Sequence, residues 1–183
     1  DKVSWIQNIW YDPVEIPISS IGDAAKKLRD IQRNWICYEN IMHRRARLIQ
    51  ERLPHISAKP IIFPTPVPKS KLGCWMLVNE NLILASPNTL SPFPNGVANF
   101  VEDKTNPPNR AYLKLWEALT FLGKYPKPGE TCVDLGSSPG GWTWVLASLG
   151  AKVISVDKAP LDAKVSAMKE VDYRQASAFG IKP

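Results

Sequence analysis

Residues 134–142 read Asp-Leu-Gly-Ser-Ser-Pro-Gly-Gly-Trp and follow a short apolar run that ends at Val133. A strand that ends in this way and continues into a helix brings its backbone close to whatever lies above the sheet edge. Glycine permits that approach because it has no Cβ. The spacing is not Gly-x-Gly-x-x-Gly, which disfavours a nicotinamide or flavin dinucleotide, nor Gly-x-x-x-x-Gly-Lys, which excludes a triphosphate cradle. The loop therefore suits the methionine part of S-adenosylmethionine (SAM), which needs backbone contacts but no pyrophosphate pocket.

A second acidic residue, Asp157, ends the next predicted strand, about fifteen residues beyond the glycines. At that place a carboxylate can accept both hydroxyls of an adenosine ribose, which supports a cofactor that contains a nucleoside. The alternative is that Asp157 only caps the turn after the strand. The cofactor-binding residues predicted from these two features are Asp134, Gly136, Ser138, Pro139, Gly140, Gly141, Trp142 and Asp157.

The elements that must position these residues lie in the second half of the chain. Apolar spacing predicts helices over residues 110–122 and 142–149, the first ended by Gly123 and the second by Gly150. Buried strands are expected over 131–135 and 152–156, and a third strand over 171–174. This alternation is the opening of a doubly wound α/β sheet. Three strands alone would leave an apolar edge open, so we expect the protein to continue or to pair.

The sequence of the first half predicts a small α+β domain over residues 1–90. Ser19 and Ser20 precede a helical pattern that runs to Ile31, and a second pattern runs from Ile41 to Arg52, where Pro54 stops it. A hairpin is expected from the apolar runs 75–78 and 82–84 around the polar turn 79–81. Prolines make 54–71 an extended connection. We expect residues 91–109 to be a linker and 110–183 to be the second domain.

Positive charge is concentrated in the first half. The formal net charge is +6, and residues 19–59 hold nine Lys or Arg against four Asp or Glu. Nucleic acid is a natural partner for such a region, and Arg44, Arg45 and Arg47 are the candidate contacts. The alternative is that these arginines form the solvated face of a surface helix, and the sequence does not separate the two interpretations.

Other classes of protein find little support in the composition. Cys37, Cys74 and Cys132 are odd in number and far apart, which favours neither a disulfide framework nor a zinc site. No apolar run reaches the roughly 18 residues that a membrane span needs, and the first residues carry no signal-peptide pattern. We therefore expect a cytoplasmic protein that binds neither a metal ion nor a membrane.

The form Asp-Leu-Gly-x-x-Pro-Gly-Gly-Trp at 134–142 resembles the first motif of the FtsJ-type ribose 2′-O-methyltransferases. Residues 110–117, Arg-Ala-Tyr-Leu-Lys-Leu-Trp-Glu, resemble the segment that carries the first lysine of that family's Lys-Asp-Lys-Glu catalytic set. The resemblance implies a Rossmann-like, SAM-dependent methyltransferase fold and an RNA substrate. It makes Lys114 a catalytic residue that orients the 2′-hydroxyl, with the proton taken by the second lysine, and it places Arg110 near RNA. The alternative is that Lys114 is a solvated lysine on an amphipathic helix.

Residues 91–96, Ser-Pro-Phe-Pro-Asn-Gly, narrow the resemblance to the RlmM-type subfamily, which methylates a cytidine ribose in bacterial large-subunit (23S) rRNA. Residues 82–183 carry this likeness, whereas residues 1–70 match only loosely. The resemblance implies that the first domain is a THUMP-like RNA-binding region.

This sequence departs from the family pattern at several positions. Ala111 stands where these enzymes have a serine that helps to hold the cofactor. Ser177 stands where an aspartate would meet the adenine amino group, and the resemblance makes it a cofactor-binding residue that forms a weaker hydrogen bond there. The remaining catalytic aspartate, lysine and glutamate are expected beyond Pro183, so we expect the chain to be truncated and its catalytic set incomplete. Two other functions stay open: a non-catalytic RNA-binding protein with a methyltransferase fold, and a SAM-dependent methyltransferase of another substrate.

Overall fold

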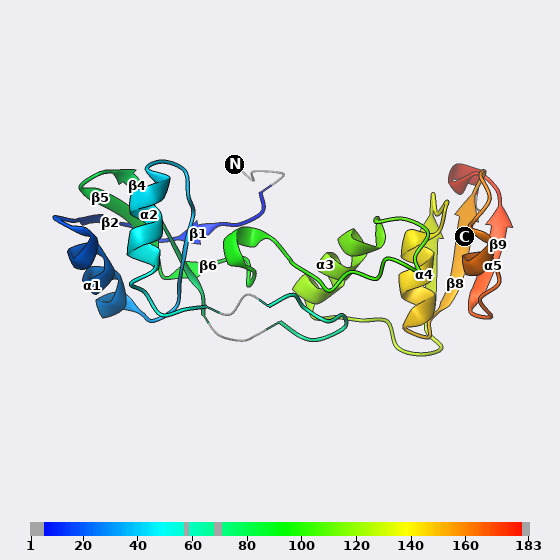
Figure 1. Ribbon diagram of the computed structural model, residues 1–183. Coiled ribbons are helices and arrows are strands. Elements are labelled where there is room, and N and C mark those ends of the chain that lie inside the picture. The colour runs from blue at the N-terminus through cyan, green and yellow to red at the C-terminus, as the bar shows by residue number, and fades with distance from the viewer. Residues whose placement is uncertain (1–5, 57–58, 68–70, 181–183) are drawn as a thin grey trace. The chain divides into compact units, whose positions relative to one another are not determined.

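The computed structural model describes residues 6–56, 59–67 and 71–180, which form two compact units (Figure 1). The N-terminal unit comprises Asp1–Pro60 and Val67–Asn99, and the C-terminal unit comprises Ile61–Pro66 and Phe100–Pro183. This division differs from the expected one, because residues 91–109 are shared between the units instead of linking them. Part of the proline-rich connection also belongs to the C-terminal unit, since Phe63 stacks on Trp116 with ring centroids 4.7 Å apart.

The N-terminal unit is built on a four-stranded sheet with the strand order β2-β5-β4-β3. Strands β2 (Val14–Pro17), β5 (Leu82–Ser86) and β4 (Gly73–Asn79) pair antiparallel, and β3 (Trp35–Cys37) joins β4 in parallel. A separate antiparallel pair joins β1 (Trp10–Tyr11) to β6 (Asn88–Thr89). The expected hairpin is confirmed as β4 and β5.

Helices α1 (Ile21–Ile31) and α2 (His43–Gln50) lie on the same face of this sheet (Figure 1). The predicted serine cap is confirmed, because the Ser20 side chain accepts a hydrogen bond from the Asp23 backbone N–H. The helices and the sheet enclose an apolar core, and the Trp35 indole inside it donates to the Leu28 carbonyl oxygen at 2.8 Å. Its buried side chains are Ile18, Ala24, Ala25, Leu28, Trp35, Ala46, Ile49, Leu53, Trp75, Leu77, Ile83 and Ala85.

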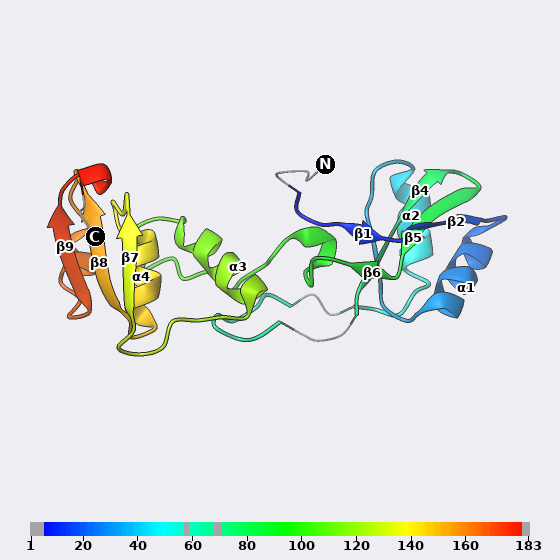
Figure 2. The same cartoon turned by 180° about the vertical axis from the view of Figure 1, so that it is seen from behind.

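The C-terminal unit contains a parallel sheet with the order β7-β8-β9, formed by Thr131–Leu135, Lys152–Asp157 and Val171–Gln175. Helix α4 (Gly141–Ser148) connects β7 to β8, and the short α5 (Ala163–Ser166) connects β8 to β9. Figure 2 shows β7 beside α4, with β8 and β9 following it in the sheet. This succession confirms the predicted strands and the α/β character of the unit.

Helix α3 (Tyr112–Leu122) precedes this sheet and ends at Gly123, which adopts a left-handed conformation (φ +62°). Its Tyr112 and Trp116 are buried and pack edge to face, with ring centroids 4.7 Å apart. Trp144 of α4 contacts both rings, so aromatic packing joins α3 to α4. Two short 3₁₀ turns, η1 (Pro94–Gly96) and η2 (Ala178–Gly180), complete the described elements.

The expectation that β7 is a buried strand is wrong. Val133 and Leu135 each expose 55% of their surface, whereas Asp134, which points to the opposite side of the sheet, is buried. Alternation along a strand places these two apolar side chains on the face opposite α4. Among the described residues β7 pairs on one edge only, with β8, which leaves its other edge open.

Candidate functional site

The loop between β7 and α4 is fastened to the end of β8. The backbone N–H of Gly136 donates to the Val156 carbonyl oxygen at 2.8 Å, and the Ser138 hydroxyl donates to the Pro160 carbonyl oxygen at 2.7 Å. Gly140 is the N-cap before α4 with φ +110°, and a Cβ at this position would lie 3.0 Å from a Val165 methyl group. Gly136 also has a positive φ (+76°), but a Cβ there would meet open space. The backbone of the loop is therefore exposed to solvent at Gly136, whereas at Gly140 it is packed against Val165.

Asp157 lies at the end of β8, as the sequence predicted. One carboxylate oxygen accepts the Ser138 N–H at 2.9 Å and the other accepts the Ala159 N–H at 2.9 Å. These hydrogen bonds, the one from Ala159 first, lower the pKa of Asp157 below its ordinary value, so the carboxylate is ionised at neutral pH. Each oxygen retains a second lone pair, so the carboxylate can still accept hydroxyl donors from a ligand while it shapes the loop.

Asp134 stands in a contrasting environment. It is only 7% exposed, and burial raises its pKa, opposed by a hydrogen bond from the Thr143 hydroxyl at 2.7 Å. The Thr143 oxygen also lies 2.9 Å from the Ser155 hydroxyl oxygen. Sequence reasoning missed Thr143 and Ser155, although a polar residue directly after Gly-Gly-Trp and a serine inside an apolar strand were both visible signals.

Trp142 and Gly141 attach α3 to this loop. The Trp142 indole N–H donates to the Ala111 carbonyl oxygen at 3.0 Å. A Cβ on Gly141 would clash with the Asn109 side-chain oxygen, which itself accepts the Ala111 N–H. The close packing at Gly141 and the Trp142 hydrogen bond therefore hold Ala111, the residue before α3 and three positions before Lys114, against the loop.

The loop fits the methionine and adenosine parts of SAM. It offers exposed backbone at Gly136, an ionised carboxylate at Asp157, and a buried Ser137 hydroxyl that has no hydrogen-bond partner among the described residues. A buried polar atom without a partner is costly, so such an atom beside a glycine loop indicates a place where a ligand supplies the partner. Two carboxylates at the ends of adjacent strands also suit a ligand that carries positive charge.

The remaining predicted residues of the C-terminal unit lie on exposed segments. Lys114 is exposed on the first turn of α3, and no hydrogen bond or ion pair of its amino group occurs within the described ranges. Arg110 forms a salt bridge of 2.7 Å with Glu102, and Ser177 follows β9 as a half-buried residue. The structure thus places Lys114 next to the segment that Trp142 anchors, and it gives Ser177 no hydrogen bond to the loop.

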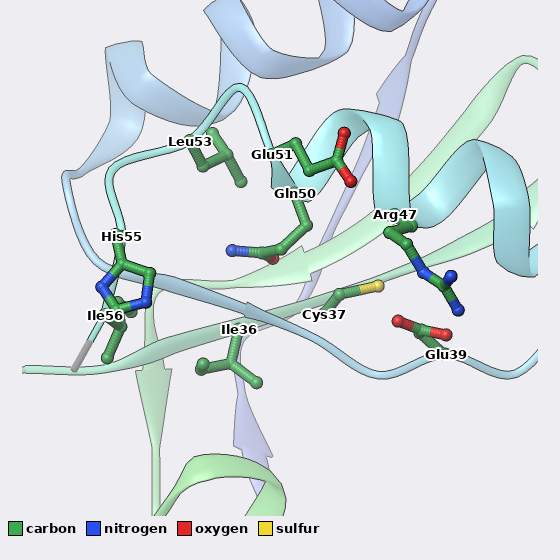
Figure 3. Close-up of a pocket in the computed structure, with 9 residues that line it drawn as sticks. All are labelled: Ile36, Cys37, Glu39, Arg47, Gln50, Glu51, Leu53, His55 and Ile56. Atoms are coloured by element: carbon green, nitrogen blue, oxygen red, sulfur yellow. The ribbon is translucent and has the colours of Figure 1, made fainter. Parts of the chain in front are cut away.

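The three candidate arginines of the N-terminal unit all lie on α2. Arg44 and Arg47 are exposed, whereas Arg45 is half-buried. Figure 3 shows the side chain of Arg47 extending toward Glu39 at the edge of a pocket of about 480 Å³. The thiol of Cys37 lines this pocket, and burial raises its pKa to about 12, so it is a neutral, unreactive group at physiological pH. The pocket therefore mixes an apolar floor with charges of both signs.

The C-terminal unit has the alternating strands and helices of an α/β fold, and its residues 107–180 match the family model described as FtsJ-like methyltransferase. The family resemblance seen in the motifs is thus confirmed for this part of the chain.

The curated relatives include proteins named "Ribosomal RNA large subunit methyltransferase M". That of Halorhodospira halophila is 38% identical over 94 residues, which are 50% of this chain and 27% of the relative. Those of Laribacter hongkongensis (37% over 106 residues) and Xanthomonas campestris (38% over 108) cover 55% and 56% of this chain and 30% and 31% of the relatives. The chain thus spans about a third or less of the length of these relatives.

The described part of the chain was also searched for a membrane-spanning helix and for a metal-binding cluster. No helix there is long and apolar enough to cross a membrane. No group of three or more His, Cys, Asp or Glu side chains there is placed to hold a metal ion.

Proposed function

We propose that this chain takes part in the SAM-dependent methylation of a ribose 2′-hydroxyl in bacterial large-subunit rRNA. The observation that carries the proposal is the loop 134–142, whose glycines, buried Asp134 and link to Asp157 form a cofactor site within the segment that matches the family. The RlmM-like segment 91–96 and the names of the relatives support rRNA as the substrate.

The residues of the loop hold SAM, which supplies an activated methyl group on its sulfonium. Asp157 accepts the ribose hydroxyls, and the backbone at Gly136, Gly140 and Gly141 leaves room for the methionine part, with Ser138, Pro139 and Trp142 shaping the loop around it. Ser177 lies after the next strand, at the edge where the adenine is expected.

Lys114 orients the substrate hydroxyl. A ribose 2′-hydroxyl is a weak nucleophile at neutral pH and must be held in line with the methyl group, so an ammonium that donates a hydrogen bond to its oxygen contributes by positioning. The anchoring of α3 by the Trp142 indole supports this role, because it ties the lysine-bearing turn to the cofactor loop.

The N-terminal unit supplies RNA affinity. Arg44, Arg45 and Arg47 on α2 contact phosphates, and a net charge of +6 supports this use. Arg110, which belongs to the C-terminal unit, contacts RNA as well. The THUMP-like character of this unit belongs to the same proposal, as does a cytoplasmic location, where ribosomal RNA is found.

Transfer of a labelled methyl group from SAM to large-subunit rRNA tests the proposal. A 2′-O-methyl group protects the adjacent phosphodiester from alkali, so the label is expected in alkali-resistant dinucleotides. The protein is assayed as its gene encodes it. Lys114→Ala is expected to lower kcat by at least about tenfold, while Lys124→Ala, a change of another exposed lysine, leaves it unaltered. Label recovered in mononucleotides after alkaline hydrolysis would contradict the proposal.

A non-catalytic RNA-binding role is a second candidate, and Ala111 favours it because it cannot make the side-chain contact expected of the family's serine. This candidate requires RNA binding without SAM binding. Calorimetry with SAM separates the two roles directly.

A further inference from the structure

Three polar side chains form a chain of hydrogen bonds in the interior of the C-terminal unit. Thr143 of α4 and Ser155 of β8 are both 0% exposed, and Asp134 of β7 is 7% exposed. The Thr143 oxygen lies 2.7 Å from an Asp134 carboxylate oxygen and 2.9 Å from the Ser155 hydroxyl oxygen. Three successive elements of the chain thus meet in one buried polar cluster.

The direction of these hydrogen bonds follows from chemistry. An ionised carboxylate only accepts, so the single hydroxyl proton of Thr143 is donated to Asp134. Thr143 then has only lone pairs left for Ser155, and the Ser155 hydroxyl must be the donor to it. Both donors therefore point toward the carboxylate, and each hydrogen bond strengthens the next.

A buried carboxylate held in this way attracts a cation. Asp134 directly precedes the exposed backbone of the glycine loop, and hydrogen bonds to its charged form offset the cost of burial. The methionine part of SAM carries an ammonium and a sulfonium, whereas the adenosine part is uncharged.

We propose that Thr143 and Ser155 are positioning residues for SAM: their hydroxyl chain holds the Asp134 carboxylate ionised and oriented toward the cationic methionine end of the cofactor. This inference rests on the proposed SAM site and deepens it. It assigns the two residues a role in recognising charge and no direct contact with the ligand.

Calorimetric titration of the 183-residue chain with SAM, and separately with adenosine, tests the inference. Thr143→Val keeps the side-chain shape and removes the hydroxyl, and it is expected to weaken SAM binding by about tenfold or more. Adenosine lacks the charged methionine, so its affinity is expected to change by less than about twofold.

Matched variants separate positioning from folding. Thr143→Ser restores the donor and is expected to recover SAM affinity to within about threefold, whereas Ser155→Ala, one bond further away, weakens it by roughly threefold. If Thr143→Val does not fold, the SAM affinities of Thr143→Ser and Ser155→Ala are compared with that of the wild type instead.

The pH dependence of SAM binding adds a readout that a purely structural role would not move. The Thr143 hydrogen bond lowers the pKa of Asp134 against the effects of burial and of the Asp157 charge, which both raise it. In Thr143→Val the loss of SAM affinity on acidification is therefore expected to begin at a higher pH than in the wild type.

The possible failures are distinguishable. A wild-type chain that binds no SAM refutes the proposed function itself. If the wild type binds SAM and Thr143→Val binds it equally well, or loses SAM and adenosine to the same extent, the inference about Thr143 and Ser155 is overturned while the SAM site stands.

Discussion

The two units bury different kinds of side chain. The N-terminal unit encloses two tryptophans and a set of aliphatic residues between helices and sheet, and its buried indole N–H groups are paired. The C-terminal unit buries a carboxylate and two hydroxyls beside its sheet while it leaves Val133 and Leu135 exposed. The first arrangement is an apolar core, whereas the second keeps a buried polar cluster that includes the first residue of the loop 134–142.

The largest effect is expected in the N-terminal core. Trp75→Ala removes a side chain that is 0% exposed and leaves the Gln50 oxygen without its indole donor, so it is expected to cost about 3–5 kcal/mol of unfolding free energy. Urea denaturation measures this loss. Leu48→Ala, at a residue 39% exposed, is the control and is expected to cost much less. Equal losses of unfolding free energy in the two variants would contradict the assignment of Trp75 to the core of this unit.

A smaller loss is expected at the glycine loop. Gly140→Ala combines a positive φ with a Cβ only 3.0 Å from Val165, so it is expected to cost about 1–3 kcal/mol. Gly136→Ala meets open space and carries only the conformational penalty of about 1 kcal/mol. Thermal unfolding of both variants is the measurement, and a larger loss at Gly136 would contradict the packing described.

Asp134→Asn is expected to raise stability at pH 7, by roughly 0.5–2 kcal/mol. Because burial raises the pKa of Asp134 above its unfolded value, the folded state binds more protons between these two values and loses stability as the pH rises through that window. The neutral amide avoids this loss, so the gain should shrink as the pH falls. Urea denaturation at pH 7 and at acidic pH measures the difference. A variant less stable than the wild type at pH 7 would show that the ionised carboxylate stabilises the fold.

The smallest effect concerns the exposed arginines of the N-terminal unit. Replacing Arg44 or Arg47 by Gln is expected to weaken RNA binding about equally for all sequences. The slope of log affinity against log salt concentration should become shallower by about one for each phosphate that the variant no longer neutralises. Filter binding over a range of salt concentrations measures both quantities. The matched control is Lys26→Gln, at an exposed lysine of α1. An equal effect of this variant would show that the RNA interface is not confined to α2.

Much of this organisation could be predicted from the sequence because it rests on local patterns. The serine cap of α1, the hairpin and the strand that ends at Leu135 depend on neighbouring residues and appear where they were expected. The exposure of Val133 could not be predicted, because apolar composition does not tell whether a strand has partners on both faces. The role of Phe63 in the C-terminal unit was equally hidden, since a proline-rich segment gives no periodicity that would reveal its packing.

The candidate site shows the same limit. Its glycines and Asp157 were recognisable from spacing, whereas the hydrogen bonds of Thr143 and Ser155 depend on how α4 packs against β7 and β8. Trp142, expected among the cofactor residues, donates its indole N–H to Ala111 and so links the loop to α3.

The most direct test of the central claim, that the C-terminal unit holds SAM, is calorimetric titration of the chain with SAM beside an Asp157→Asn variant. The wild type is expected to bind SAM with one-to-one stoichiometry, and the variant to bind it at least about tenfold more weakly, because the amide accepts ribose hydroxyls less well than the carboxylate does. Absence of binding by the wild type, or equal affinity in the two proteins, would contradict the account.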